Sequence, residues 1–317
     1  MSKSELFIGI DVSKSELEMA ARPEGKAMTF ANTEDGIAFL IDFLKPLCPS
    51  LVVLEATGGL EISLVNALAI KEIPVVVVNA RQVRDFAKAI GRLAKTDRID
   101  AEVIAQFAET LRPPVRPLKD EETQRLHALN SRRRQLVGMI RSEQNRLSSA
   151  PKWTQKEIQN HLRWLRKALG KIDKDIADLI KGSPMWREKE AILRSFKGVG
   201  PVTSASLLAG VPELGSINSK PLSALIGVAP LNRDSGQWRG KRAVWGGRDN
   251  VRSVLYMATM SAIRFNPIIA SFYKKLTAAG KPHKVAMTAC MHKTLVILNS
   301  MIKNKTYWNP LVCEKCL

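Results

Sequence analysis

The first third of the chain alternates between short apolar runs and amphipathic stretches. The runs are almost continuously hydrophobic, which is typical of strands buried on both faces, and they occupy residues 6–12, 51–54 and 74–80. Apolar side chains recur at helical spacing in residues 34–47, about 60–71 and about 96–111. The stretch LEMAARPEG and the following KAMTFANT predict an antiparallel strand pair around a turn. Strands that alternate with helices indicate an α/β layer with a mainly parallel sheet.

The pattern changes to long helices after residues 112–117, which read RPPVRP. Three prolines in six residues cannot continue a helix, so a first domain of residues 1–111 is predicted to end here. Within residues 119–181, leucine and isoleucine recur at steps of three and four, and SSAP at 148–151 interrupts the repeat. The repeat predicts a helical coiled-coil connector, either an antiparallel hairpin or a dimerising coiled coil.

Residues 182–317 are predicted to form a mainly helical domain. The stretch FKGVGPVTSASLLAGV at 196–211 resembles half of a helix-hairpin-helix, a motif whose backbone N–H groups bind phosphate. Gly198 and Gly200 are therefore candidate nucleic-acid contacts, although a turn between two packed helices has the same composition. A helix at 219–228, an irregular basic segment at 229–250 and a largely helical region at 251–304 follow.

The 317 residues carry a formal net charge of +19, which is unevenly distributed. Residues 1–111 hold 12 basic and 16 acidic side chains, residues 112–197 hold 21 and 10, and residues 198–317 hold 16 and 4. An acidic first third joined to a basic remainder indicates a polyanionic partner, of which nucleic acid is the commonest. The connector's helix faces away from the seam are basic, and they include Arg132, Arg133 and Arg134. Such a face is either simply solvated or in contact with phosphate, and both alternatives stay open.

Several classes of protein are excluded by what the chain lacks. No run of about 18 apolar residues predicts a membrane span, and the N-terminal stretch MSKSELFIGIDVSKSE lacks the cleavage site of a secretory signal. Four cysteines do not make a disulfide framework, so a cytosolic, reducing compartment is expected.

Four carboxylates are the main candidates for chemistry in the first domain. Asp11 and Glu55 end predicted strands, and Asp97 and Asp100 share one face near the start of a predicted helix. If they converge at one edge of a sheet, they suit a hard cation such as Mg²⁺, which takes oxygen ligands. Each also has a structural alternative, because strand ends and helix N-termini favour such residues without any metal.

Glu61 is the main competitor for the place given to Glu55. It lies six residues further along the chain, after the turn that follows the strand. We favour Glu55 because the end of a strand fixes the position of a side chain better than the next helical turn does.

Several short sequence motifs of the chain resemble those of a known family. An Asp on the first strand, a Glu on a later strand and paired Asp on a helix look like the DEDD centre of RuvC-like, ribonuclease-H-fold nucleases. The stretches GIDVSK, LEATGG and KTDRIDAEVIA resemble the N-terminal domain of the IS-one-ten insertion-sequence transposases. GVGPVTSASLLA, ALIGVAP and SGQWRGKR resemble that family's C-terminal transposase domain, and the motifs keep the family's order along nearly the whole chain.

The resemblance implies a second catalytic element, a serine in the C-terminal domain that matches Ser235. Gly236 beside it gives the serine hydroxyl steric access to a substrate. Nearby cations could hold a scissile phosphate, and they are Arg233, Arg239, Lys241 and Arg242. No histidine lies in this segment, so a Ser-His-Asp arrangement within it is unsupported. The alternative is a polar turn residue, and the loop departs from the family's commoner wording, which leaves Ser223 and Ser253 as further candidates in predicted helices.

The resemblance implies a recombinase that cuts and rejoins DNA strands through a covalent phosphoserine intermediate, with the metal-binding carboxylates of another protomer completing the site. It further implies donor and target double-stranded DNA, a structured bridge RNA as guide, a dimer that assembles to a tetramer, and a place in the bacterial cytosol near the nucleoid. Two alternatives stay open. One is a metal-only RuvC-like endonuclease or junction resolvase, and the other is a non-enzymatic, basic nucleic-acid-binding protein.

Cysteine and tryptophan give weaker signals. The terminal CxxC of Cys313 and Cys316 supplies only two zinc ligands, so a frayed tail is favoured over a metal site. Other candidate ligands lie in a predicted helical region, at His283, Cys290 and His292. Base stacking and core packing are equally open for Trp238 and Trp245, and packing along the hairpin is predicted for Trp153 and Trp164.

Overall fold

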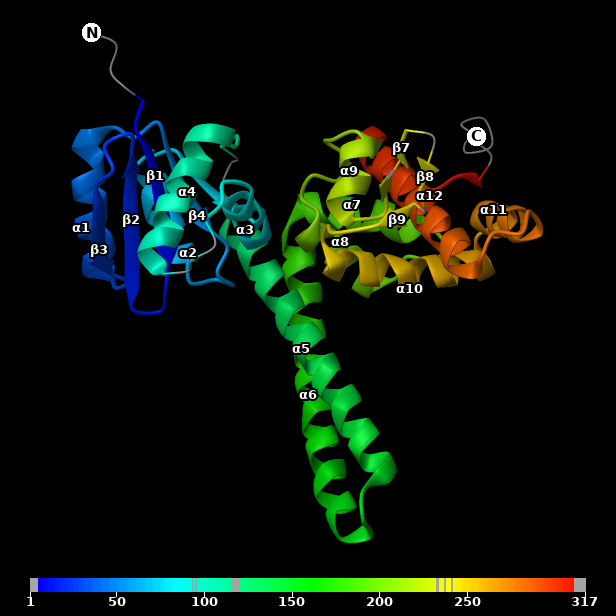
Figure 1. Ribbon diagram of the computed structural model, residues 1–317. Coiled ribbons are helices and arrows are strands. Elements are labelled where there is room, and N and C mark those ends of the chain that lie inside the picture. The colour runs from blue at the N-terminus through cyan, green and yellow to red at the C-terminus, as the bar shows by residue number, and fades with distance from the viewer. Residues whose placement is uncertain are drawn as a thin grey trace. The chain divides into compact units, whose positions relative to one another are not determined.

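The computed structural model describes residues 5–92, 94, 96–115, 120–231, 234–236, 238–240 and 242–310 (Figure 1). Its contacts divide the chain into two compact units, Met1–Lys119 and Asp120–Leu317. The first unit is a mixed α/β layer, and the second is mostly helical. The division falls next to the proline-rich segment, whereas the helical connector and the C-terminal region belong to one unit.

The first unit is built on a five-stranded sheet. Its strands are β1 (Phe7–Val12), β2 (Glu16–Arg22), β3 (Ala27–Ala31), β4 (Leu51–Glu55) and β5 (Val75–Val78), in the order β3-β2-β1-β4-β5. The pairs β1–β2 and β2–β3 are antiparallel, and the pairs β1–β4 and β4–β5 are parallel. The sheet is therefore mixed rather than mainly parallel, because the short links after β1 and β2 allow only hairpins.

Helices cover both faces of this sheet. One core contains alternate residues of β1 and β4 together with α1 (Glu34–Leu44) and α2 (Ile62–Ile70). The other core contains the intervening residues with α3 (Ala80–Ala89) and α4 (Asp97–Leu111). A 3₁₀ turn, Lys45–Leu47, follows α1. The sequence predicts every strand and three of these helices, but it misses α3.

Helix α4 lies against β1 at Gly9. A Cβ atom at Gly9 would come within 2.1 Å of the Ala105 backbone nitrogen and 2.4 Å of the Ala101 carbonyl oxygen. Near the C-terminal end of α4, Glu109 forms an ion pair of 2.6 Å with Arg22. Arg22 lies on β2, opposite Phe7 at the start of β1. Helix α4 therefore runs antiparallel to β1, and its first turn lies where β1 ends.

Two long helices, α5 (Glu121–Ser149) and α6 (Lys152–Gly182), form an antiparallel hairpin in the second unit (Figure 1). Leu126, Ile176 and Ile180 at its base share one core with the remaining helices. These helices are α7 (Pro184–Ser195), α8 (Pro201–Gly210), α9 (Ser219–Ile226), α10 (Asp249–Phe265), α11 (Pro267–Ala278) and α12 (His283–Asn304). The hairpin is thus rooted in the C-terminal core.

The basic segment between α9 and α10, predicted to be irregular, contains two short strand pairs. Strand β6 (Pro230–Leu231) pairs with β9 (Ala243–Val244), and β7 (Asp234–Ser235) pairs with β8 (Trp238–Arg239). Both pairs are antiparallel, so the segment folds back on itself as a nested β-hairpin.

Two tryptophans of the hairpin contradict their predicted packing. Trp153 is 85% exposed and Trp164 is 58% exposed. Trp164 stacks on His161 instead, with ring centroids 6.2 Å apart. The seam between α5 and α6 is filled by smaller aliphatic side chains, which include Leu162 and Leu165.

Among the described residues, one helix, α12, is long and apolar enough to cross a membrane by length and composition alone. More than half of that stretch is buried inside the second unit, in the core that α12 shares with α7–α10. A single helix of this kind is weak evidence for a membrane span, because core helices of soluble proteins pass the same test.

The contact at Gly9 predicts a local stability effect. Replacing Gly9 by Ala forces a methyl group into the backbone of α4, and we expect a loss of about 3 kcal/mol, the upper end of the usual cost of overpacking. Hydrogen exchange of the β1 and α4 amides measures it locally. Gly170→Ala in α6 is the matched control, because nothing lies within 4 Å of its Cβ position. Equal effects of the two substitutions would contradict the close contact.

Candidate active site

Asp11 and Glu55 end neighbouring strands at the same edge of the sheet. Ile10 of β1 lies opposite Leu54 of β4 in the parallel register, so Asp11 and Glu55 are the next residues on each strand. Ile10 and Leu54 point into the core with α1 and α2. Because side chains alternate along a strand, Asp11 and Glu55 point to the face that α4 covers.

Asp97 and Asp100 lie in the first turn of α4. The Thr96 hydroxyl caps this helix by accepting a hydrogen bond from the Ile99 backbone N–H, 3.2 Å away. Asp100 is half-buried and precedes Ala101, which packs over Gly9, whereas Asp97 is exposed. The positive end of the helix dipole favours both carboxylates, and the antiparallel packing of α4 brings them to the edge where β1 and β4 end.

Glu55 and Asp100 line one cavity of about 510 Å³. Helix α3 forms the rest of its wall, through Ala80, Arg81, Val83, Arg84, Asp85 and Lys88. The structure therefore brings two of the four predicted carboxylates into one pocket and leaves Asp11 and Asp97 at the same edge outside its lining. In the described part of the chain, no three His, Cys, Asp or Glu side chains group closely enough to hold a metal ion.

Glu61 binds the loop that follows β4. Its Oε2 accepts hydrogen bonds from the Thr57 hydroxyl (2.8 Å), the Thr57 N–H (3.2 Å) and the Gly59 N–H (2.8 Å). Burial opposes ionisation of this carboxyl, but its hydrogen bonds to the loop and to its own backbone outweigh burial and lower the pKa. Glu61 thus anchors the loop that follows Glu55.

Ser235 is exposed at the end of β7, where it pairs with Trp238. Gly236 follows it with φ at 55°, a left-handed conformation that glycine adopts easily. Arg242 is exposed on the same hairpin. Arg233 and Lys241 lie outside the described residues, and for Arg239 only the backbone is described. Of the other serines considered, Ser223 is buried in α9 and donates to the Ser219 carbonyl, and Ser253 is exposed in α10.

The base of this β-hairpin is held by Arg248, which sequence reasoning missed. Its guanidinium donates to both carboxylate oxygens of Glu213, at 2.6 and 2.7 Å, and to the Gly210 carbonyl at 2.8 Å. Gly227 and Gly247 approach so closely that a Cβ atom on either would meet the backbone of the other turn. The serine therefore projects on a short strand pair whose root is fixed to α8 and α9.

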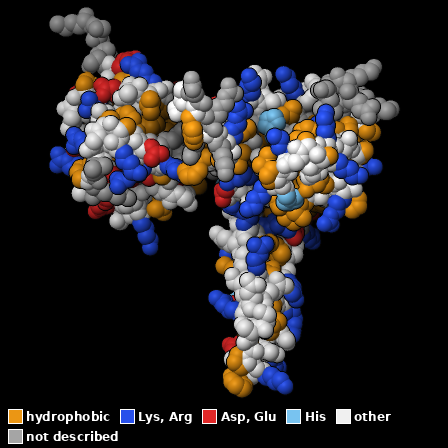
Figure 2. Space-filling model, turned by 45° about the vertical axis from the view of Figure 1, so that its right-hand side comes forward, with side chains coloured by type: hydrophobic (Ala, Val, Ile, Leu, Met, Phe, Trp, Pro, Cys, Tyr) orange, Lys and Arg blue, Asp and Glu red, His pale blue; other side chains and the backbone are white. Residues whose placement is uncertain are grey.

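The predicted nucleic-acid contacts of the hairpin separate into two kinds. Arg133 faces α6 and pairs with Asp173 at 2.6 Å, so its expected place on a face away from the seam is wrong. Arg132 and Arg134 are exposed. Figure 2 shows Lys and Arg spread along the visible side of the hairpin and over the C-terminal unit, with a hydrophobic group at the hairpin's tip.

Gly198 has a packing reason for being glycine. A Cβ atom there would come within 2.9 Å of the Ala258 carbonyl and the Ala262 Cα of α10. Gly200 is the N-cap of α8. The turn joins α7 to α8 as a helical hairpin, and the close contact at Gly198 matches the alternative of a glycine turn between packed helices.

The structure places the candidate tryptophan, cysteine and histidine residues in different environments. Trp238 and Trp245 are 64% and 57% exposed, so neither is a core residue. Burial raises the pKa of Cys290 to about 11 and lowers the pKa of His292. His283 Nδ1 lies 2.7 Å from the Tyr273 hydroxyl. Cys313 and Cys316 lie outside the described residues.

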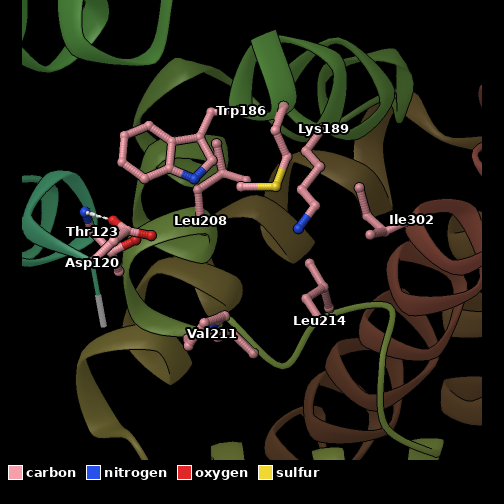
Figure 3. A pocket seen from close by; sticks show the side chains of 10 residues that line it. Asp120, Thr123, Trp186, Lys189, Leu208, Val211, Leu214 and Ile302 are labelled. Carbon is pink, nitrogen blue, oxygen red and sulfur yellow. Dashed lines mark hydrogen bonds between the residues drawn. The ribbon is translucent and has the colours of Figure 1, made fainter. Parts of the chain in front are cut away.

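A second cavity, of about 160 Å³, lies at the base of the helical hairpin in the second unit (Figure 3). Its wall is largely apolar, with Trp186, Leu208, Leu214 and Ile302 around the Lys189 side chain. Asp120 at its edge caps α5 by accepting from the Thr123 N–H at 2.6 Å. None of the predicted catalytic residues lines it, so the acidic edge remains the candidate site.

Two family models match the chain. One, of the DEDD type and described as "Transposase", matches residues 8–150, which include all four carboxylates. The other, described as "Transposase IS116/IS110/IS902 family", matches residues 190–274, which include Ser235. The chain belongs to the IS110 family of transposases. It is therefore a DNA-rearranging enzyme, and its DEDD domain implies use of divalent metal.

Relatives agree with this membership. The "Pilin gene-inverting protein" of Moraxella bovis is 26% identical over 98% of this chain and 100% of its own length. The protein of the same name from Moraxella lacunata is 25% identical over the same shares. The "Insertion element IS110 uncharacterized 43.6 kDa protein" of Streptomyces coelicolor is 24% identical over 43% of this chain and 33% of its own length.

The hydrogen bonds of Glu61 predict a pH-dependent stability. A carboxyl whose pKa is lowered by folding contributes stability that is full above its unfolded value, and loses it as pH falls through the folded pKa. We therefore expect Glu61→Gln to destabilise the protein at pH 7 and to match the wild type progressively below pH 4.5, the ordinary value of this group. Denaturant unfolding across this range measures the difference, and a gap that stays constant with pH would contradict it.

Proposed function

We propose that this IS110-family transposase cuts and rejoins DNA strands through Ser235, with the carboxylate edge of the first unit completing the active site. The strand order β3-β2-β1-β4-β5, with β1 in the centre and α4 packed on it, supports a ribonuclease-H-like, RuvC-like fold for that unit. The single observation that carries the proposal is the meeting of Glu55 and Asp100 in one cavity, beside the strand end that holds Asp11.

The carboxylate edge fits a divalent cation, which we take to be Mg²⁺. Its donors are all carboxylate oxygens, and these are the ligands that hard cations prefer. Glu55 and Asp100, which line one cavity, would hold the ion, with water and a substrate phosphate completing its shell. Asp11 and Asp97 lie at the same edge outside the cavity lining, and they are the proposed further ligands once a metal and DNA draw the edge together. Such an ion lowers the pKa of a nucleophile and stabilises a developing negative oxygen.

Ser235 supplies the nucleophile in this proposal. Its Oγ forms a bond to the scissile phosphorus, the bond from phosphorus to a bridging ester oxygen of the DNA breaks, and that oxygen leaves as a hydroxyl that carries the serine proton. A hydroxyl of the exchanged strand then attacks the phosphoserine and releases Ser235, so the sequence consumes no co-reactant. The exposure of Ser235 on a hairpin with Arg242 supports it, because a DNA phosphate can reach both.

The partners in this proposal are donor and target duplex DNA, a structured guide RNA, and further copies of the chain. The net charge of +19 supports polyanionic partners, and the exposed Arg132 and Arg134 extend basic surface along the hairpin. The guide RNA, the dimer that assembles to a tetramer, and a cytosolic location rest on the resemblance to the family. The name of the Moraxella bovis relative, "Pilin gene-inverting protein", supports exchange of DNA segments as the reaction.

A metal-only nuclease is the second candidate. The acidic cavity belongs wholly to the first unit, so that unit has the groups for hydrolysis without Ser235. Family membership excludes the third reading, a non-enzymatic binding protein.

Ser235→Ala separates the two candidates. Removing the nucleophile lowers strand cleavage by about a thousandfold or more if the serine attacks phosphorus. The measurement is cleavage of duplexes that carry the DNA flanking the chain's own gene, with the copurified RNA retained. Ser253→Ala, which removes another exposed serine of the same unit, is the control and leaves the rate unchanged. Cleavage that survives Ser235→Ala would favour the metal-only nuclease.

Substituting the carboxylates that line the cavity is expected to affect cleavage and DNA binding differently. Asp100→Asn and Glu55→Gln keep the shape of the cavity but weaken binding of a cation, so we expect cleavage to fall at least about a hundredfold while DNA binding persists. Glu61→Gln is the matched control, because Glu61 serves the loop and leaves the cavity's carboxylates in place. Its cleavage rate should stay within a few-fold of the wild type at pH 7. Equal losses for Glu55→Gln and Glu61→Gln would contradict the assignment of Glu55.

A further inference from the structure

Helix α3 follows β5 directly and forms the wall of the acidic cavity. Asn79 caps it by accepting from the Arg81 N–H at 2.8 Å. Val83 and Ala87 are buried against the core beneath the sheet. The polar face of the helix is left for the cavity and solvent, and Val83, at the edge of the buried face, lines the cavity as well.

Three cations stand on that face, at the helical spacing of Arg81, Arg84 and Lys88. All three line the cavity that Glu55 and Asp100 also line. Asp85, between them, lies 3.7 Å from Arg81 and 3.9 Å from Lys88. These side chains are all more than half exposed, and such exposed pairs contribute little to stability. Stability therefore does not explain why α3 concentrates cations here.

Arg84 differs from its neighbours. It is exposed on the cavity wall, and within the described residues it forms no ion pair. A guanidinium is a planar fork that binds phosphate oxygens with two hydrogen bonds. A cavity of about 510 Å³ lies in the size range of ordinary ligand sites.

We propose that α3 is a phosphodiester-binding site, in which Arg84, flanked by Arg81 and Lys88, holds the DNA backbone over Glu55 and Asp100. The inference rests on the proposed function in one respect, that DNA enters the acidic cavity. It adds the residues that hold the strand there. Without a bound metal the carboxylates repel a phosphate, so cations on the cavity wall favour a strand that lies over them, and α3 provides three.

Binding without chemistry tests the site. In EDTA, the affinity of the full-length protein for a duplex of the flanking DNA is measured from 50 to 300 mM salt, a range on the order of that over which phosphate contacts are lost. Arg84→Gln is expected to weaken binding and to reduce the log–log salt slope by about 0.9 for the lost contact. Lys71→Gln, which removes the same charge from the end of α2, leaves affinity and slope unchanged. An unchanged slope for Arg84→Gln overturns the proposal.

Chemical footprinting gives an independent readout on the unaltered protein. Acetylation of lysines, followed by mass spectrometry, compares Lys88 with Lys71 in the presence and absence of the duplex. We expect the duplex to slow modification of Lys88 at least about fivefold and to leave Lys71 unaffected. Equal reactivity of Lys88 with and without DNA overturns the site.

The two proposals fail separately. If α3 is protected in EDTA but the wild type forms no cleaved strand with metal present, the catalytic proposal fails and the binding site stands. If the wild type cleaves DNA and Arg84→Gln binds with an unchanged salt slope, the binding site fails and the catalytic proposal stands.

Discussion

The contact of α4 with the backbone of β1 at Gly9 is the constraint on which the candidate site depends. No side chain separates the helix from the strand, so the position of α4 along β1 is fixed by backbone atoms rather than by adaptable side chains. That position places the first turn of α4 at the edge where β1 and β4 end. Asp100 thereby meets Glu55 in one cavity, and Asp11 lies on the adjacent strand end. The same arrangement leaves the other wall of the cavity to α3, whose cations balance the carboxylates.

Chemically similar residues have different environments in each of the two units. Glu55 lines the cavity, whereas Glu61 accepts hydrogen bonds from the loop between them. The two arginines at 132 and 133 are neighbours in sequence, yet one is solvent-exposed and the other pairs with Asp173 across the hairpin. In both cases residues of the same type have different contacts, because Glu61 binds the loop and Arg133 binds Asp173.

Sequence patterns predict the long elements because periodicity accumulates over many residues, as in α5, α6 and the strands β1 and β4. They miss α3 because only Val83 and Ala87 of its ten residues are buried, so its apolar period is short. They miss the strand pairs around Ser235 because two-residue strands are defined by their partners rather than by their own composition. Packing along the hairpin is predicted for Trp153 and Trp164 because large apolar side chains are usually buried, and the pattern of a single helix does not indicate the exposure that the structure shows. The strand ends of Asp11 and Glu55 are predictable, but the cavity is not, because α3 supplies six of its eight lining residues.

In the proposed reaction, the carboxylates of the first unit act together with Ser235 of the second. The most direct measurement is mass spectrometry of the protein after reaction with its flanking DNA and nuclease digestion, which locates any nucleotide left on a side chain. The wild type should carry a nucleotide on Ser235, and Asp100→Asn should bind the DNA but carry none. A nucleotide on another residue, or an undiminished adduct in Asp100→Asn, would contradict the claim.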